Sequence, residues 1–168
     1  AASHTLPDDI QVLFLGGGDP KLMQQIEREG KHCKTLGPAY GPKRNALLRD
    51  SRAQLLAVSS LDEPFGLTVL EAASAGVPAA VRPSGALPEI IEDGLNGYIA
   101  EDLSLTSYAE ILLRGLRTKP QLTGESLSQY TLERFGSMNT TFKVVDLAES
   151  ILSVRDEVKY ELKRGCRK

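Results

Sequence analysis

Apolar residues in this chain fall into two patterns, short unbroken runs and longer stretches with helical spacing. Unbroken runs bounded by turn residues predict buried strands, and apolar positions three and four apart predict helices. The predicted strands are residues 10–15, 33–36, 54–58, 77–81 and 98–100. The predicted helices are residues 21–30, 43–49, 67–75, 106–117, 122–135 and 137–163, with one further turn within 84–91. Alternating strands and helices with short loops predict an α/β fold, in which helices cover both faces of a parallel sheet and extra helices follow.

Turn residues support these boundaries. Asp19 and Pro20 suit the N-cap and first position of a helix, and Gly76 suits the end of the helix before it. The size, 168 residues, is that of one domain, which we place at 1–168 with a core over 10–153 and a helical tail to 168. With 41% hydrophobic and 25% charged residues, the composition is that of a globular protein.

Charge and cysteine content narrow the function classes. A net charge of −2 argues against a general nucleic-acid binder, and two distant cysteines indicate neither a disulfide framework nor a zinc site. No signal peptide can be read at Ala1–His4, so we expect a cytoplasmic protein. The basic stretch Lys159–Lys168 could touch an anionic membrane surface, although a solvated helix end explains it as well.

Ligands of open parallel sheets bind beyond the carboxyl ends of the strands, which points to the loops after each predicted strand. The first of these contains Gly16, Gly17 and Gly18, which do not form a dinucleotide fingerprint because Lys21 stands where that motif needs a glycine or alanine. A tight turn without a ligand remains an equal alternative for this loop. The other loops are residues 37–42, 59–66 and 82–89.

The segment from Asp62 to Glu71 carries the strongest signal. Glu63 lies in a loop and Glu71 lies inside the next helix, eight positions later. Between them, the backbone N–H groups of Phe65, Gly66 and Leu67 are expected to point out of the helix start, where they favour an anion such as a diphosphate. Gly66 is expected to keep that approach open. An anion site between two carboxylates suits a nucleotide sugar, which has a diphosphate between two polyols.

Each of these residues also has an ordinary interpretation. Glu63 could be a solvated loop residue, whereas Glu71 belongs to the most apolar helix of the chain and should either face a polar cleft or have a specific partner. Four basic residues near strand ends could touch phosphate, although surface charges are the simpler interpretation: Lys21, Lys43, Arg44 and Arg82.

The run EPFGLTVLEAASAGVPAAV, the following GALPEI and DGLNG segments, and the Glu133-Arg134-Phe135 end of a late helix resemble one known family. With the early glycine loop, the Leu36-Gly37 turn and Ser59, they resemble the carboxy-terminal, donor-binding domain of family 4 retaining glycosyltransferases with the GT-B fold, which is Rossmann-like. The resemblance extends over about residues 10–153. In this order and spacing, the E-x7-E motif is highly specific.

The resemblance implies a role for each candidate residue. Glu63 would contact the transferred sugar beside its anomeric carbon, as a positioning and electrostatic group, and is the candidate catalytic residue. Glu71 would hold the ribose hydroxyls. The amides of Phe65, Gly66 and Leu67 would face the sugar and diphosphate. The remaining candidate binding residues would flank the base or line the same cleft: Gly37, Ala39, Tyr40, Gly16, Gly17 and Gly18.

The resemblance also implies a reaction, the transfer of a hexosyl group from a nucleoside diphosphate sugar to a hydroxyl of a sugar, lipid or small molecule. No metal cofactor is expected, because the sequence has no Asp-x-Asp pair. In this family an amino-terminal domain binds the acceptor, and the first strand and loop of the carboxy-terminal half carry an Arg and a Lys that neutralise the leaving diphosphate. This chain is expected to lack both features, so it is expected to be inactive alone. The alternative is a non-catalytic module that binds nucleotide sugars or has a regulatory role, although retention of Glu63 and Glu71 together with Phe65-Gly66 favours the enzyme.

Overall fold

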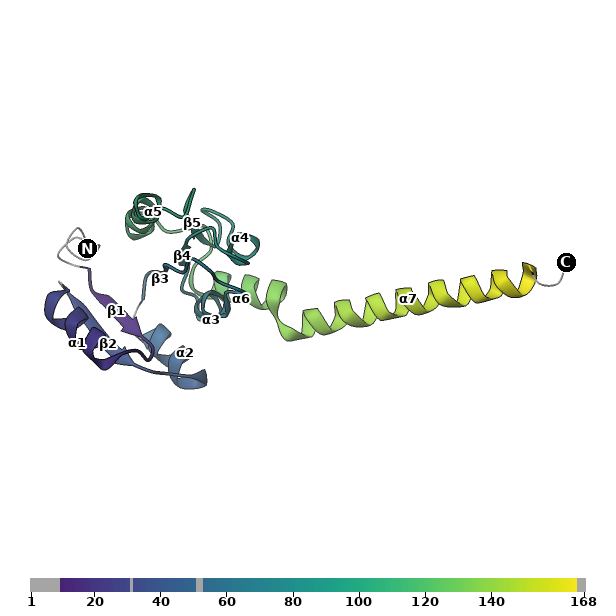
Figure 1. Cartoon of the computed structure of the whole chain (residues 1–168), viewed down its shortest axis with the longest axis horizontal. Coiled ribbons are helices and arrows are strands. Elements are labelled where there is room, and N and C mark those ends of the chain that lie inside the picture. Colours follow the sequence, from purple (N-terminus) through teal and green to yellow (C-terminus); the bar gives the residue numbers. More distant parts are fainter. Residues whose placement is uncertain (1–9, 31, 51–52, 166–168) are drawn as a thin grey trace. The chain divides into compact units, whose positions relative to one another are not determined.

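The computed structural model describes residues 10–30, 32–50 and 53–165 of the chain. The described residues divide into two compact units, the first ending at Ser128 and the second beginning at Gln129. Along the first unit the elements follow in the order β1 (Val12–Leu15), α1 (Pro20–Glu29), β2 (Cys33–Gly37), α2 (Gly41–Asp50), β3 (Leu56–Val58), α3 (Leu67–Ser74), β4 (Ala79–Val81), α4 (Leu87–Ile90), β5 (Gly97–Ile99) and α5 (Leu105–Arg117), as labelled in Figure 1.

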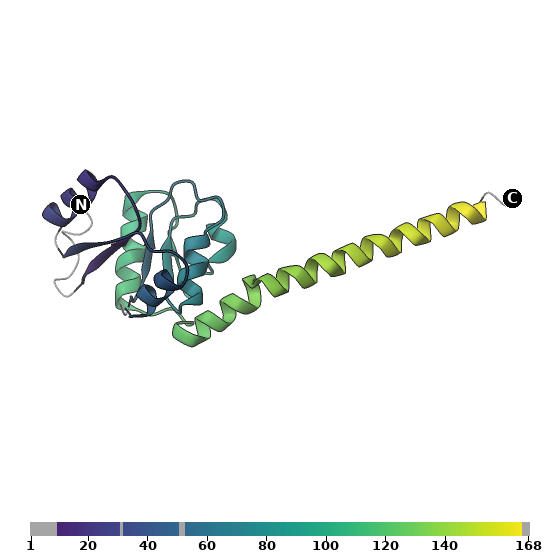
Figure 2. The same cartoon turned by 90° about the horizontal axis from the view of Figure 1, so that it is seen from below.

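Two helices form the carboxyl-terminal part of the chain. Helix α6 (Gly124–Phe135) begins in the first unit and ends in the second, and α7 (Ser137–Gly165) follows it. Helix α7 is one continuous helix of 29 residues, seen from green to yellow in Figure 1 and Figure 2. No helix in the described ranges combines the length and apolarity that crossing a membrane requires.

The strands are parallel, as predicted, and they form two sheets rather than one. In the first, β1 pairs with β2 from Val12 opposite Cys33 to Leu15 opposite Gly37. In the second, β4 lies between β3 and β5. Strand β3 keeps three residues of the predicted five, and its ladder bonds go to β4. The α/β fold with parallel strands and flanking helices is confirmed.

The core of the first unit lies on both faces of the second sheet. All three residues of β4 are buried. Ala80 packs in a cluster with Tyr98 of β5 and with Tyr108 and Ile111 of α5. Because side chains alternate along a strand, the neighbours of Ala80 in β4 face the other way, where α3 packs and buries Val69, Ala72 and Ala73.

The helix cap at Asp19 and the helix end at Gly76 formed as the sequence predicted. The Asp19 carboxylate accepts a hydrogen bond from the Lys21 N–H at 2.9 Å, which caps α1, and Pro20 is its first residue. Gly76 follows α3 with a φ of +84°, the left-handed conformation that ends helices. The carbonyl of Gly76 accepts from the Gly124 N–H at 2.9 Å, which joins the end of α3 to the start of α6.

Candidate functional site

The loop that carries Glu63 is held by its backbone. The Glu63 N–H donates to the Ser84 hydroxyl at 3.0 Å, and the Glu63 carbonyl accepts from the Ala86 N–H at 3.2 Å. Gly85 lies so close that a Cβ there would stand 1.9 Å from the Glu63 carbonyl oxygen. These hydrogen bonds therefore connect the loops after β3 and β4 and fix the backbone of Glu63, whose side chain is half-buried.

The Glu63 carboxylate lies at the amino-terminal end of α3. Its Oε1 accepts from the Gly66 N–H at 3.0 Å. Gly66 is the N-cap residue of α3 and has a φ of +81°. The structure differs here from the sequence prediction, because the Gly66 amide is used by Glu63 rather than left for an anion. The Val69 N–H donates to the Gly66 carbonyl at 3.0 Å, so the helix start leaves the Leu67 and Thr68 N–H groups, which precede the regular helical ladder.

Gly66 also serves a different purpose from the one predicted. It is buried, and a Cβ there would lie 2.9 Å from the side chains of Leu87 and Ile90. The glycine is therefore required by its left-handed backbone and by close packing on α4, not by an open approach for a ligand. Its neighbours Phe65 and Leu67 are exposed.

Glu71 lies in α3 and has a specific partner. Its Oε1 is 2.6 Å from a terminal nitrogen of Arg44, which comes from α2. The two side chains keep 32% and 22% of their surface exposed, so the pair is sheltered but reachable from solvent. Of the two interpretations open for Glu71, a specific partner is the one that the structure shows.

Two of the glycine positions meet at the end of the first sheet. The Gly16 N–H donates to the Gly37 carbonyl at 3.0 Å, continuing the β1–β2 pairing into both loops. Gly17 and Gly18 are exposed, and a Cβ at Gly17 would have no heavy atom within 4 Å. Beyond Gly37 the chain passes a buried Ala39 and an exposed Tyr40. The structure thus joins the loops at Gly16 and Gly37, and joins Glu63 to Gly66.

Arg82 is not the surface charge that the sequence suggested. It is 5% exposed, donates to the Ser59 carbonyl at 3.4 Å, and its guanidinium lies 5.3 Å from the centre of the Tyr108 ring. Burial raises the pKa of the Tyr108 hydroxyl to about 12, against the opposing influence of the Arg82 charge. The position of Arg82, directly after an apolar strand, was the one sequence feature that could have indicated its role. No sequence feature indicated that Tyr108 or Ser84 would contact the residues of this site. Lys21 and Lys43 are exposed, as expected for surface charges.

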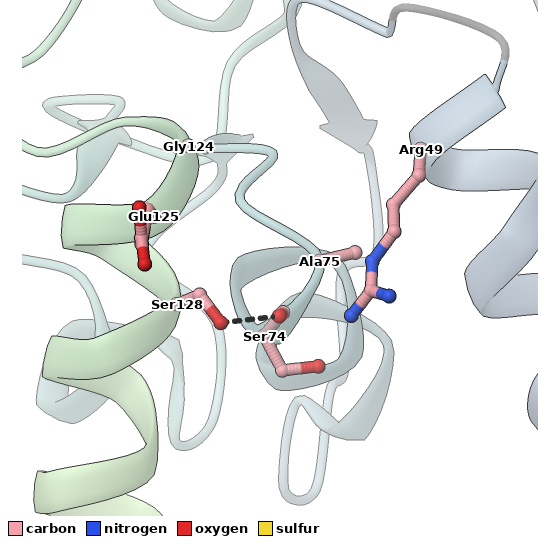
Figure 3. Close-up of a pocket in the computed structure, with 6 residues that line it drawn as sticks. All are labelled: Arg49, Ser74, Ala75, Gly124, Glu125 and Ser128. Atoms are coloured by element: carbon pink, nitrogen blue, oxygen red, sulfur yellow. Dashed lines mark hydrogen bonds between the residues drawn. The ribbon is translucent and has the colours of Figure 1, made fainter.

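A hollow of about 270 Å³ lies at the opposite end of α3 from Glu63. Figure 3 shows Ser128 of α6 donating to the Ser74 carbonyl, at 2.7 Å, with Arg49 and Glu125 on either side. Sequence reasoning placed no candidate residue there. Within the described ranges, no group of three or more His, Cys, Asp or Glu side chains is arranged to hold a metal ion.

The region from Glu63 to Glu71 thus contains the start of α3, a carboxylate bound to it, and a second carboxylate paired with Arg44. Helix N-termini attract anions, and partly exposed carboxylates accept hydrogen bonds from hydroxyl groups. Such a region can bind a ligand that has both phosphate and polyol groups.

Comparison with known proteins identifies the family. Residues 2–131 match the family model described as glycosyl transferases group 1. An N-acetyl-alpha-D-glucosaminyl L-malate synthase of Bacillus anthracis is 33% identical over 61% of this chain and 28% of its own length. Spore coat protein SA of Bacillus subtilis is 29% identical over 92% of this chain and 44% of its own length.

Solved structures agree on the fold. Anabaena HepE, in complex with UDP and glucose, superposes with a TM-score of 0.70 at 22% identity, over 89% of this chain and 43% of that chain. The chain therefore spans less than half the length of each of these three relatives. The parallel α/β fold is that of a GT-B glycosyltransferase carboxy-terminal domain, and the chain belongs to the glycosyl transferases group 1 family.

Proposed function

We propose that this chain is the donor-binding part of a retaining glycosyltransferase that transfers a hexosyl group from a nucleoside diphosphate sugar to a hydroxyl acceptor. The observation that carries the proposal is the hydrogen bond between Glu63 and Gly66, which holds a partly exposed carboxylate at a helix N-terminus. Anabaena HepE, which shares the fold, has been solved with UDP and with UDP-glucose, and this supports a nucleotide sugar as the ligand class.

Each residue has a chemical task in this proposal. The Leu67 and Thr68 N–H groups at the start of α3 face the diphosphate, where the helix dipole favours negative charge. Glu63 positions the sugar and supports positive charge that develops at the anomeric carbon, because preorganised groups act most strongly where charge develops in the transition state. Glu71 accepts hydrogen bonds from the ribose hydroxyls. The loops at residues 16–18 and 37–40 flank the base and the sugar.

The rest of the reaction is proposed on the same basis. The acceptor would be bound by an amino-terminal domain, so the isolated chain would bind donor without turnover. No metal cofactor is included, since amide dipoles and cationic side chains can neutralise a leaving diphosphate. We place the reaction in the cytoplasm, with the basic end of the chain as a candidate contact with an anionic membrane surface.

Titration with UDP, GDP and ADP, followed by amide chemical shifts in NMR spectra, tests the donor site. We expect one of the three to shift the amides of residues 65–68. Replacing Glu71 by Ala or Gln should weaken that nucleotide at least about tenfold, because hydrogen bonds to a charged group are lost. Glu110→Ala, which removes an exposed carboxylate from α5, is the matched control and should leave binding unchanged. Binding that survives both Glu71 variants would contradict the proposed site.

A further inference from the structure

The partner of Glu71 comes from a different part of the chain. Arg44 lies in the first turns of α2, which begins at Gly41, directly after the loop at residues 37–40. Its guanidinium reaches α3 and forms an ion pair with Glu71, with 2.6 Å between a terminal nitrogen and Oε1. One ion pair thus connects the helix that follows the loop proposed to flank the base with the carboxylate proposed to hold the ribose.

The contact uses only part of the Glu71 carboxylate. Arg44 approaches Oε1, and an ionised carboxylate offers about four acceptor sites on its two oxygens. A ribose presents two adjacent hydroxyl groups, each of which can donate one hydrogen bond. The pair therefore leaves acceptor sites for a vicinal diol while one oxygen is held in place.

The hydrogen bonding of Arg44 is not what we would expect of a side chain that only supports packing. Its Nε is buried and has no hydrogen-bond partner among the described residues. A fully satisfied, two-pronged contact would stabilise the α2–α3 packing more strongly. The single contact instead orients the carboxylate and leaves it reachable, since a third of the Glu71 side chain stays exposed.

We infer that Arg44 is a positioning residue, which orients the Glu71 carboxylate for the two ribose hydroxyls of the nucleotide. This role rests on the proposed function of Glu71. A carboxylate that is oriented before the ligand arrives loses less conformational freedom on binding, and this raises affinity without any contact between Arg44 and the nucleotide. Removing Arg44 should therefore weaken only those nucleotides that carry the diol.

The test compares UDP, GDP and ADP with their 2′,3′-dideoxy analogues, on the full chain and on Arg44→Ala, by NMR titration. For the nucleotide that binds, we expect Arg44→Ala to reduce affinity about tenfold, and to change affinity for the dideoxy analogue less than about twofold. Arg44→Lys keeps the charge but loses the planar guanidinium, so its affinity should lie between the two. Thermal unfolding shows whether each variant is folded.

Arg49→Ala is the matched control, because it removes an exposed arginine from the same helix at the far end from Arg44. Equal affinity of Arg44→Ala and the unchanged chain, or equal weakening of nucleotide and dideoxy analogue, would overturn the positioning role while leaving the donor site intact. If the unchanged chain binds none of the three nucleotides, the proposed function falls and this role falls with it. Should Arg44→Ala fail to fold, the same comparison is made with Arg44→Lys.

Discussion

The two sheets of the first unit differ in how deeply their strands are buried. Every residue of β4 is buried, and α3 and α5 both contribute buried apolar side chains beside it. In the β1–β2 sheet no strand residue is fully buried, and neither is any residue of α1. An apolar run such as that of β1 is enough to form a strand, but its burial depends on what packs against it. The hydrophobic contribution to stability is therefore concentrated in the second sheet.

Truncating a leucine in each region should give the largest contrast. Leu87 of α4 is fully buried, whereas Leu22 of α1 is 54% exposed. Leu87→Ala should lower the free energy of unfolding by about 3–5 kcal/mol, because lost burial and a cavity both contribute. Leu22→Ala should change it by less than about 0.5 kcal/mol. Urea denaturation followed by circular dichroism measures both, and similar losses for the two variants would remove the contrast.

Substituting Gly85 and Gly17 should give a smaller difference in stability, and Gly85 also tests the position of the Glu63 loop. Gly85 has a φ of +52° and leaves no room for a Cβ beside Glu63, whereas a Cβ at Gly17 meets no other atom. Gly85→Ala should cost about 2–4 kcal/mol, from left-handed backbone strain and from steric overlap. It should also displace the Glu63 loop.

Gly17→Ala is the control and should leave the chain's stability unchanged. Thermal unfolding gives the stability change, and the amide shifts of residues 63–66 report the loop. A Gly85→Ala variant with unperturbed shifts at these residues would contradict the tie between the two loops.

Acid should weaken the contact between α1 and the first sheet, because this contact depends on the Glu27 carboxylate. Glu27 of α1 accepts hydrogen bonds from the hydroxyl and from the N–H of Thr35 in β2, the latter at 2.8 Å, and these hold the pKa of Glu27 below its usual 4.5. A carboxyl group whose pKa is lower in the folded state than in the unfolded state stabilises the fold. This contribution is complete above the unfolded-state pKa and is lost as the pH falls through the folded-state pKa. The α1–β2 contact should therefore persist at neutral pH and weaken below about pH 4.5.

The Thr35 amide shift, followed by NMR from pH 7 to pH 3, measures this effect. It should titrate below 4.5 in the unchanged chain and lose that step in Glu27→Gln, while the amides of β4 stay constant. If β4 amides change at the same pH as Thr35, the two sheets respond to acid as one unit and the comparison fails.

Most of the secondary structure could be predicted from the sequence, because its signals are local. The cap at Asp19, the left-handed Gly76 and the apolar run of β4 each act through a few neighbouring residues, and all three formed as predicted. The division of the strands into two sheets could not be predicted in this way, since an apolar run does not say which strand pairs with it.

In the candidate site too, the features that depend on local sequence could be predicted and those that depend on distant residues could not. Glu63 and Glu71 stood out in the sequence by their spacing around a helix start, and that spacing is local. Their partners did not stand out. Ser84 lies 21 positions from Glu63, and Arg44 was one of four similar basic residues. Arg82, expected at the surface, is buried against Tyr108.

The amino-acid sequence by itself determined which stretches form helices and strands, and which two carboxylates lie before and within α3. Steric limits on the backbone and hydrogen bonds within a few residues decide such features. Only the tertiary structure decided that Ser84 holds the Glu63 loop and that Arg44 pairs with Glu71. These contacts depend on side-chain geometry and on how separate loops and helices pack, which no spacing within one helix specifies.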